Sequence, residues 1–172
     1  MPDATTPHPV VNYSVAAKLL HWGFIPLFVY GIVKQVDDVV QLDDGAFLRF
    51  EMVFATLFLV VLVARFGYMK TTQRSALPNA SPLWQRRAAK AVHYGMYASL
   101  AAIALSGILV GLLYGAGLKS GLILEAALAL HGVTVSISYW LIAVHILAAL
   151  YHRWLKDGVW NAMVPFWKES SR

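Results

Sequence analysis

Three histidines lie inside strongly apolar segments, where an imidazole is costly to bury and its presence therefore indicates a function. His131 and His145 are fourteen residues apart in one segment, and His21 lies in another. Fourteen helical residues make almost four turns, so the two rings share a helix face about 21 Å apart. Such a separation suits two haem irons, one near each surface of a bilayer. The spacing predicts a b-type cytochrome.

The composition narrows the kind of haem. The 172-residue chain is 59% hydrophobic, only 13% charged and without cysteine. Without cysteine there are no disulfides, iron–sulfur clusters or covalently attached c-type haem, so any haem is held by axial ligands and packing. The net charge of +5 does not predict a nucleic-acid partner, because the basic residues follow a membrane topology.

Four apolar segments position the histidines. Residues 91–118 and 126–151 carry no charge, and each run exceeds the ~20 residues that cross a hydrocarbon core. Two earlier segments carry charges near their ends, where long side chains reach the membrane interface. We predict an all-α integral membrane four-helix bundle in contact with lipid. It forms a single domain over residues 1–172, with spans at about 15–36, 46–69, 90–116 and 126–152.

Loop charges orient this bundle. One side carries basic residues in the 70–90 linker and the C-terminal segment: Lys70, Arg74, Arg86, Arg87, Lys90, Arg153, Lys156, Lys168 and Arg172. The other side is mainly acidic: Lys34, Arg49 and Lys119 against Asp37, Asp38, Asp43, Asp44, Glu51 and Glu125. The positive-inside rule places both termini in the cytoplasm, in a bacterial inner membrane. Residues 1–12 lack a basic region, so we expect no secretory signal and a retained first helix.

In this orientation His21 and His145 lie at similar depth near the cytoplasmic surface, on the first and fourth helices. Two neutral imidazoles on facing helices predict a six-coordinate haem b. The competing interpretation is that each ring makes a hydrogen bond between helices, in a haem-free structural membrane protein. We predict His21 and His145 as the metal ligands.

His131 lies near the periplasmic end and is deep enough to ligate a second haem. The second helix contains no histidine, and Glu51 and Met52 stand at the expected depth. Methionine opposite histidine is an established axial pair that raises the haem potential, whereas glutamate favours a weakly ligated iron. Alternatively this site is empty and His131 hydrogen-bonds Glu51. The sequence thus predicts one haem b and leaves a second open.

His93 and His152 lie near the cytoplasmic ends of the third and fourth helices. An imidazole can donate a hydrogen bond to a quinone carbonyl and relay a proton from the aqueous side. We predict that these two histidines line a quinone pocket. The alternative is that they hydrogen-bond lipid headgroups or haem propionates.

In order along the chain, these motifs resemble the bacterial cytochrome b561 family. The motifs are His21-Trp22, H-x-x-x-Y at His93–Tyr97, and the histidine series of the fourth helix. Relatives of that family include superoxide:ubiquinone oxidoreductase and the cytochrome b subunits of hydrogenases and formate dehydrogenases. The resemblance implies that His21 and His145 ligate the cytoplasmic haem, and that His131 ligates the other haem with a helix-two histidine. Counting back fourteen residues from Arg65 lands on Glu51 instead.

The resemblance also implies a haem b electron-transfer protein that exchanges electrons with ubiquinone, in one version by oxidising periplasmic superoxide. Four aspartates between residues 37 and 44 would repel that anion. They suit the alternative, a conduit or anchor for a periplasmic dehydrogenase or a basic soluble cytochrome c. The sequence does not decide whether the chain is itself an oxidoreductase.

Overall fold

The computed structural model describes residues 12–34, 36, 38–78 and 80–169, and the N-terminal segment, Asp37 and Arg172 lie outside them. This described part is helical and contains no strand. Its elements are α1 (Val15–Val33), the 3-10 helix η1 (Val39–Asp43), α2 (Gly45–Thr72), α3 (Leu83–Gly115), α4 (Leu122–Leu155) and α5 (Val159–Met163). The helices α1, α2, α3 and α4 are each long and apolar enough to cross a membrane, which confirms the predicted fold class.

The observed helices differ from the predicted spans at their ends. Helix α3 begins at Leu83, well before residue 90, and α4 runs from Leu122 to Leu155. Backbone hydrogen bonds continue through polar helical turns outside the hydrocarbon core. The helices are therefore longer than the apolar segments from which they were predicted. Side-chain caps fix two starts: Ser14 Oγ accepts from the Ala17 amide, and Asp44 Oδ1 accepts from the Ala46 amide at 2.8 Å.

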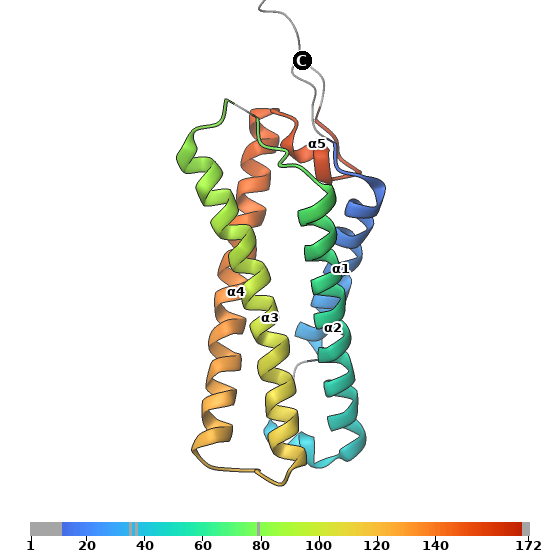
Figure 1. Ribbon diagram of the computed structural model, residues 1–172, viewed down its shortest axis with the longest axis vertical. Helices are drawn as coiled ribbons and strands as arrows, with labels where there is room; N and C mark the ends of the chain where they lie inside the picture. The colour runs from blue at the N-terminus through green and yellow to red at the C-terminus, as the bar shows by residue number, and fades with distance from the viewer. Residues whose placement is uncertain (1–11, 35, 37, 79, 170–172) are drawn as a thin grey trace, which may run out of the picture.

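Successive helices run in opposite directions (Figure 1). The starts of α1 and α3, the ends of α2 and α4, and α5 lie together at what we call the α5 end. Helix η1 and the turn between α3 and α4 lie at the opposite η1 end. Helix α3 packs against both α2 and α4, and α1 packs against α2. This arrangement brings residues of all four long helices to the same depth.

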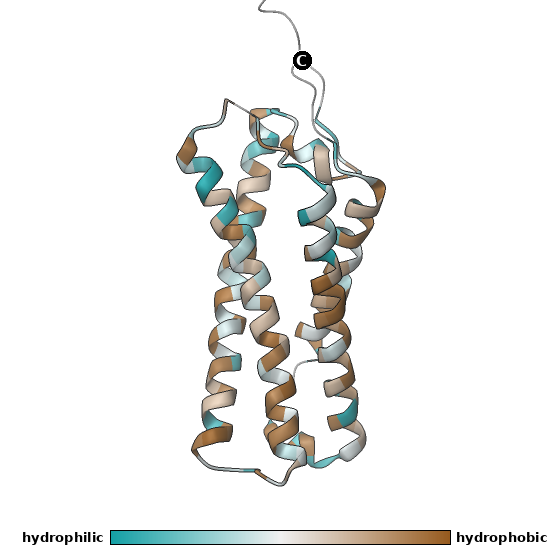
Figure 2. Ribbon diagram, in the orientation of Figure 1, coloured by the Kyte–Doolittle hydropathy of each residue, from teal (hydrophilic) through white to brown (hydrophobic). Residues whose placement is uncertain are grey.

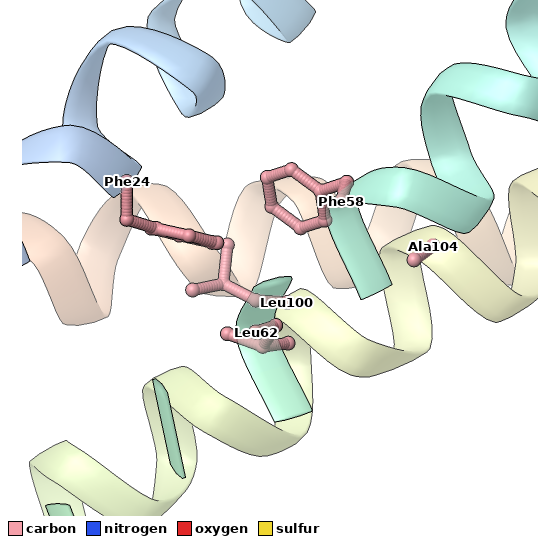
Figure 3. Packing of buried hydrophobic residues seen from close by; sticks show 5 residues of the cluster. All are labelled: Phe24, Phe58, Leu62, Leu100 and Ala104. Atoms are coloured by element: carbon pink, nitrogen blue, oxygen red, sulfur yellow. The ribbon is translucent and has the colours of Figure 1, made fainter. Parts of the chain in front are cut away.

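Two small apolar clusters hold α2 and α3 to their neighbours. One consists of Phe24, Phe58, Leu62, Leu100 and Ala104, from α1, α2 and α3 (Figure 3). The other joins η1, α3 and α4 near the η1 end through Leu42, Val110, Tyr114, Leu124 and Ala127. Neither cluster includes His21, His131 or His145.

Large apolar side chains cover the outside of the helices. Trp140 is 76% exposed, Val53 67% and Leu147 65%. Figure 2 shows hydrophilic residues gathered at the α5 end of α2 and α3, with brown apolar segments along the helices below. A soluble monomer does not expose so much contiguous apolar surface, whereas a lipid-facing bundle must.

Candidate functional site

Three predicted site histidines meet near the α5 end. The ring centroids of His21 on α1 and His145 on α4 are 6.3 Å apart, with an interplanar angle of 62°. The ring of His93, on α3, lies 5.1 Å from that of His145 at an angle of 82°. The first and last long helices therefore present their imidazoles to one another, as the similar depth of the two histidines predicts.

An arginine completes this group. Arg65, on α2, donates from Nη2 to Nδ1 of His21 across 2.6 Å. Its guanidinium lies over the rings of Phe24 and Tyr97, 5.7 and 5.3 Å from their centroids. Its Nε is buried without a hydrogen-bond partner, and no carboxylate of the described residues forms an ion pair with it. From the sequence, Arg65 was taken only as a marker of spacing, although a lone cation inside an apolar helix is itself a sign of a functional residue.

His93 keeps one ring nitrogen available. Its Nδ1–H donates to the backbone carbonyl of Ala89 at 2.7 Å, because a carbonyl can only accept. Its Nε2 therefore carries the lone pair, on a ring that lies against His145. This is the tautomer that can bind a metal or accept a hydrogen bond.

His152 lies apart from this group. It is 8% exposed, and its Nδ1–H donates to Asp157 Oδ2 at 2.6 Å. Its Nε2 lies 3.3 Å from the side-chain nitrogen of Gln85 on α3. The seven-residue interval from His145 to His152 corresponds to about 10 Å along the helix, so His93 and His152 do not share one contact group. The sequence did not identify Asp157 and Gln85 as partners of His152, because Asp157 lies beyond the end of α4 and Gln85 lies on α3.

The η1 end contains the second predicted site. His131 Nδ1 lies 3.0 Å from Ser106 Oγ on α3, so its observed partner is Ser106 rather than Glu51. Glu51 Oε1 is buried without a hydrogen-bond partner. Met52 packs against Gly111: a Cβ atom at Gly111 would lie 2.7 Å from Met52 Cγ. A groove of about 410 Å³ runs beside Met52 along α2, lined by Val53, Thr56, Leu57 and Val60.

The α5-end residues fit a haem. A metal–imidazole bond is about 2 Å long, so two imidazoles on opposite sides of one metal place their ring centroids about 6 Å apart. The observed separation of 6.3 Å between His21 and His145 matches this requirement. Because an arginine only donates, Arg65 occupies the lone pair of His21 Nδ1, and ligation through Nε2 requires Arg65 to release that nitrogen.

The comparison with known families agrees with this arrangement. The family described as prokaryotic cytochrome b561 matches residues 12–166, which is nearly the whole chain. No curated protein and no solved structure matches the chain.

Proposed function

Since the chain belongs to the prokaryotic cytochrome b561 family and is a haem b electron-transfer protein of a bacterial membrane, we propose that it exchanges electrons with ubiquinone at the cytoplasmic surface. In this proposal His21 and His145 would hold the iron of a haem b near the α5 end. A bound haem supplies one-electron redox chemistry there. The protein's own residues hold it, set its potential and deliver protons.

One observation carries the proposal: the ring centroids of His21 on α1 and His145 on α4 are 6.3 Å apart. No hydrogen bond joins these two described rings, so their approach is not explained as a hydrogen bond between helices. Two neutral imidazoles on one iron make a low-spin haem that changes oxidation state with little rearrangement. Such a centre suits electron transfer rather than oxygen binding.

Charge at the α5 end supports a cytoplasmic location for this haem. The described residues there include the basic side chains Lys18, Lys70, Arg74, Arg86, Arg87, Lys90, Arg153, Lys156 and Lys168. Among the residues that the structure describes at this end, the acidic side chains are Asp157 and Glu169. An excess of lysine and arginine marks the cytoplasmic side of a membrane protein.

The quinone assignment is supported by the hydrogen-bonding state of the α5-end histidines. Reduction of a quinone to its quinol takes two electrons and two protons, so protonatable groups are needed beside the haem. The available Nε2 of His93 bears a lone pair, so it can accept from the hydroxyl of a quinol, and it can donate to a quinone carbonyl once it has taken up a proton. The His152–Asp157 pair lies about 10 Å further toward the aqueous phase along α4. We propose that His93 contacts the quinone and that His152 passes protons inward from the surface.

The electron partner at the η1 end stays a prediction. Lys119 Nζ lies 2.5 Å from Asp43 Oδ1, so its charge is already paired and steers superoxide poorly. Asp38 and Asp44 accept backbone hydrogen bonds that cap η1 and α2. These aspartates therefore have structural functions, and neither superoxide oxidation nor docking of a basic cytochrome is favoured over the other.

The test is the haem content of purified protein. The pyridine haemochrome of the wild type should show at least one haem b per chain. His21→Ala and His145→Ala should each remove one haem and its low-spin signal. His131→Ala is the matched control for the low-spin signal of the α5-end haem, which it should leave in place, because it removes a histidine from the same bundle but keeps the pair of His21 and His145. Purified protein without a Soret band, or two α5-end variants with normal haem content, would contradict the proposal.

A further inference from the structure

We propose that residues 157–167, which we call the clasp, fix the spacing of His21 and His145, and that Trp22 is the positioning residue through which the clasp acts. This inference rests on the proposed function and deepens it, because it names the contacts that would keep both imidazoles on one iron. Three observations on described residues carry it.

The first observation is that the two proposed ligands lie on helices that do not pack closely against each other. Helix α1 packs against α2, α2 against α3, and α3 against α4. Among the residues that the structure describes, α1 and α4 have no such packing along their lengths. The separation of His21 and His145 therefore depends on three successive helix contacts, unless a further link joins α4 to α1.

The second observation is that the clasp supplies this link. Lys156 and Gly158 have left-handed backbone conformations, with φ of 54° and 85°, which end α4 and turn the chain. The clasp, which includes α5, then reaches the start of α1 (Figure 1), where the Tyr13 amide donates to the Ala162 carbonyl at 3.2 Å. The clasp therefore closes the ring of helices at the α5 end.

The third observation is that the clasp is attached beside His21. Nε1 of Trp22 donates to the Met163 carbonyl at 3.1 Å, and the Trp22 ring lies 4.8 Å from the ring of Phe166. The same indole meets the imidazole of His21 edge-on, with 5.8 Å between the ring centroids. A displacement of the clasp therefore moves the residue that is bonded to, and in contact with, a proposed ligand.

The other contacts of this part of α1 hold it to α2. Arg65, which donates to Nδ1 of His21, lies on α2, and so does Phe58, which packs against Phe24. These contacts fix His21 relative to α2 and leave its distance from α4 to be set elsewhere. Through Trp22, the clasp connects His21 to the chain that follows α4.

The two attachments of Trp22 can be removed separately. Trp22→Phe keeps an aromatic ring beside Phe166 but loses the indole N–H, whereas Trp22→Leu loses both contacts. The net contribution of one hydrogen bond corresponds to a factor of about 2–10 in an equilibrium constant. An aromatic pair contributes a factor of roughly the same size. Trp22→Leu should therefore separate the two histidines more often than Trp22→Phe does.

The first measurement is the distance between α1 and α4 in full-length, reduced protein in lipid nanodiscs. Because the chain contains no cysteine, spin labels at Leu19→Cys and Leu147→Cys report this distance alone. Leu19 on α1 and Leu147 on α4 are 69% and 65% exposed, so the labels disturb little packing. The distance distribution should be narrow with Trp22 present, and broader and longer in Trp22→Leu.

The second measurement is the rate of carbon monoxide binding to the reduced protein. An iron with imidazoles at both axial positions has none free for carbon monoxide, so binding reports the release of one histidine. Trp22→Phe should bind it about 2–10-fold faster than the wild type. Trp22→Leu should be faster still. Phe166→Ala should also be faster than the wild type, because it weakens the same attachment from the clasp and leaves α1 unchanged.

Trp154→Leu is the matched control. Trp154 is a 76-to-75% class surface residue at the same end of the bundle, and its ring contact is with Tyr151 of its own helix. It should leave the distance distribution and the carbon monoxide rate unchanged. An effect as large as that of Trp22→Leu would show that anchoring of tryptophans in the membrane interface, rather than the clasp, is responsible.

Unchanged distances and rates in Trp22→Phe, Trp22→Leu and Phe166→Ala would overturn the inference. If Trp22→Leu does not fold, the other two variants still decide it. A wild type that contains haem in that case leaves the proposed function standing. A wild type without haem would refute the proposed function, and the distance distributions alone would then decide whether the clasp sets the spacing of α1 and α4.

Discussion

The guanidinium of Arg65 donates a 2.6 Å hydrogen bond to Nδ1 of His21 between two apolar helices. The cation lies between the faces of Phe24 and Tyr97, and no described carboxylate pairs with it. A buried cation beside a redox centre stabilises the state that has gained an electron. Once His21 ligates through Nε2, the released donors of Arg65 are available to an acceptor at the same site.

Arg65→Leu should therefore lower the midpoint potential of the haem held by His21 and His145. A unit charge about 7–14 Å away at an effective dielectric constant of about 20 is worth roughly 50–100 mV for a one-electron couple. Arg65→Lys keeps the charge but loses the planar stacking, so its potential should stay closer to the wild-type value. Redox titration followed by absorbance measures all three proteins. A normal haem content with an unchanged potential in Arg65→Leu would show that another group neutralises this charge.

The sequence predicts the helices of this protein better than it predicts their contacts. Charge-free runs of 28 and 26 residues leave little choice but spanning helices, and the fourteen-residue interval places His131 and His145 on one face. Helix ends were less predictable: the turns around Arg86 and Arg87 stay helical in α3 although they are polar. Hydropathy reports where lipid ends, not where backbone hydrogen bonding ends.

The candidate site was likewise predictable in its depth but not in its contacts. The approach of His21 to His145 follows from depth along the membrane normal, which residue counting supplies. The contacts of Arg65 with His21 and of Asp157 with His152 depend on how each helix rotates about its axis and on the turn after α4. That rotation is set by packing between helices, which one sequence does not state. The preference of His131 for Ser106 over Glu51 was missed for this reason.

Gly111→Ala tests the close contact between α2 and α3. Its Cβ atom would lie 2.7 Å from Met52 Cγ, so Met52 or the helix must move. Overpacking of this kind costs about 1–3 kcal/mol and should lower the thermal unfolding temperature in detergent. The control is Gly67→Ala on α2, where a Cβ atom meets nothing within 4 Å and improves helix propensity. Equal unfolding temperatures for the two variants would show that the α2–α3 contact is loose.

The Asp43–Lys119 pair gives the η1 end a defined pH dependence. The hydrogen bond from Lys119, and a second from Tyr114, lower the pKa of Asp43 below its ordinary value of 3.8. The same contact raises the pKa of Lys119 above its ordinary value of 10.5. The stabilisation from Asp43 is therefore present above its ordinary pKa and is lost as pH falls through the lowered one. That from Lys119 is present below its ordinary pKa and is lost as pH rises through the raised one.

Asp43→Asn should accordingly lower the unfolding temperature slightly between those limits, and the difference should vanish in strong acid. The effect should also shrink at high salt, because both side chains are half exposed and screened. Lys119→Gln should give the same pH profile on the acid side, and the double variant should be no worse than either single one. A wild-type advantage that persists below the lowered pKa of Asp43 would contradict the charge-pair explanation.

Asp157→Asn tests whether His152 delivers protons. The Asp157 carboxylate accepts from His152 Nδ1–H through Oδ2 and from the Val159 amide through Oδ1, and asparagine keeps one of these two acceptors. We expect the fold and the haem content to be preserved, and the haem content is measured to check this. It removes the negative charge that stabilises a protonated imidazole, and oxidation of the pre-reduced protein by a ubiquinone analogue should slow roughly tenfold. Stopped-flow absorbance gives the rate. Glu169→Gln is the control, since Glu169 accepts from the Gly158 amide near this turn, whereas His152 contacts Asp157 and Gln85. Equal rates in Asp157→Asn and the control would show that His152 and Asp157 only connect α4 to α5 and do not deliver protons.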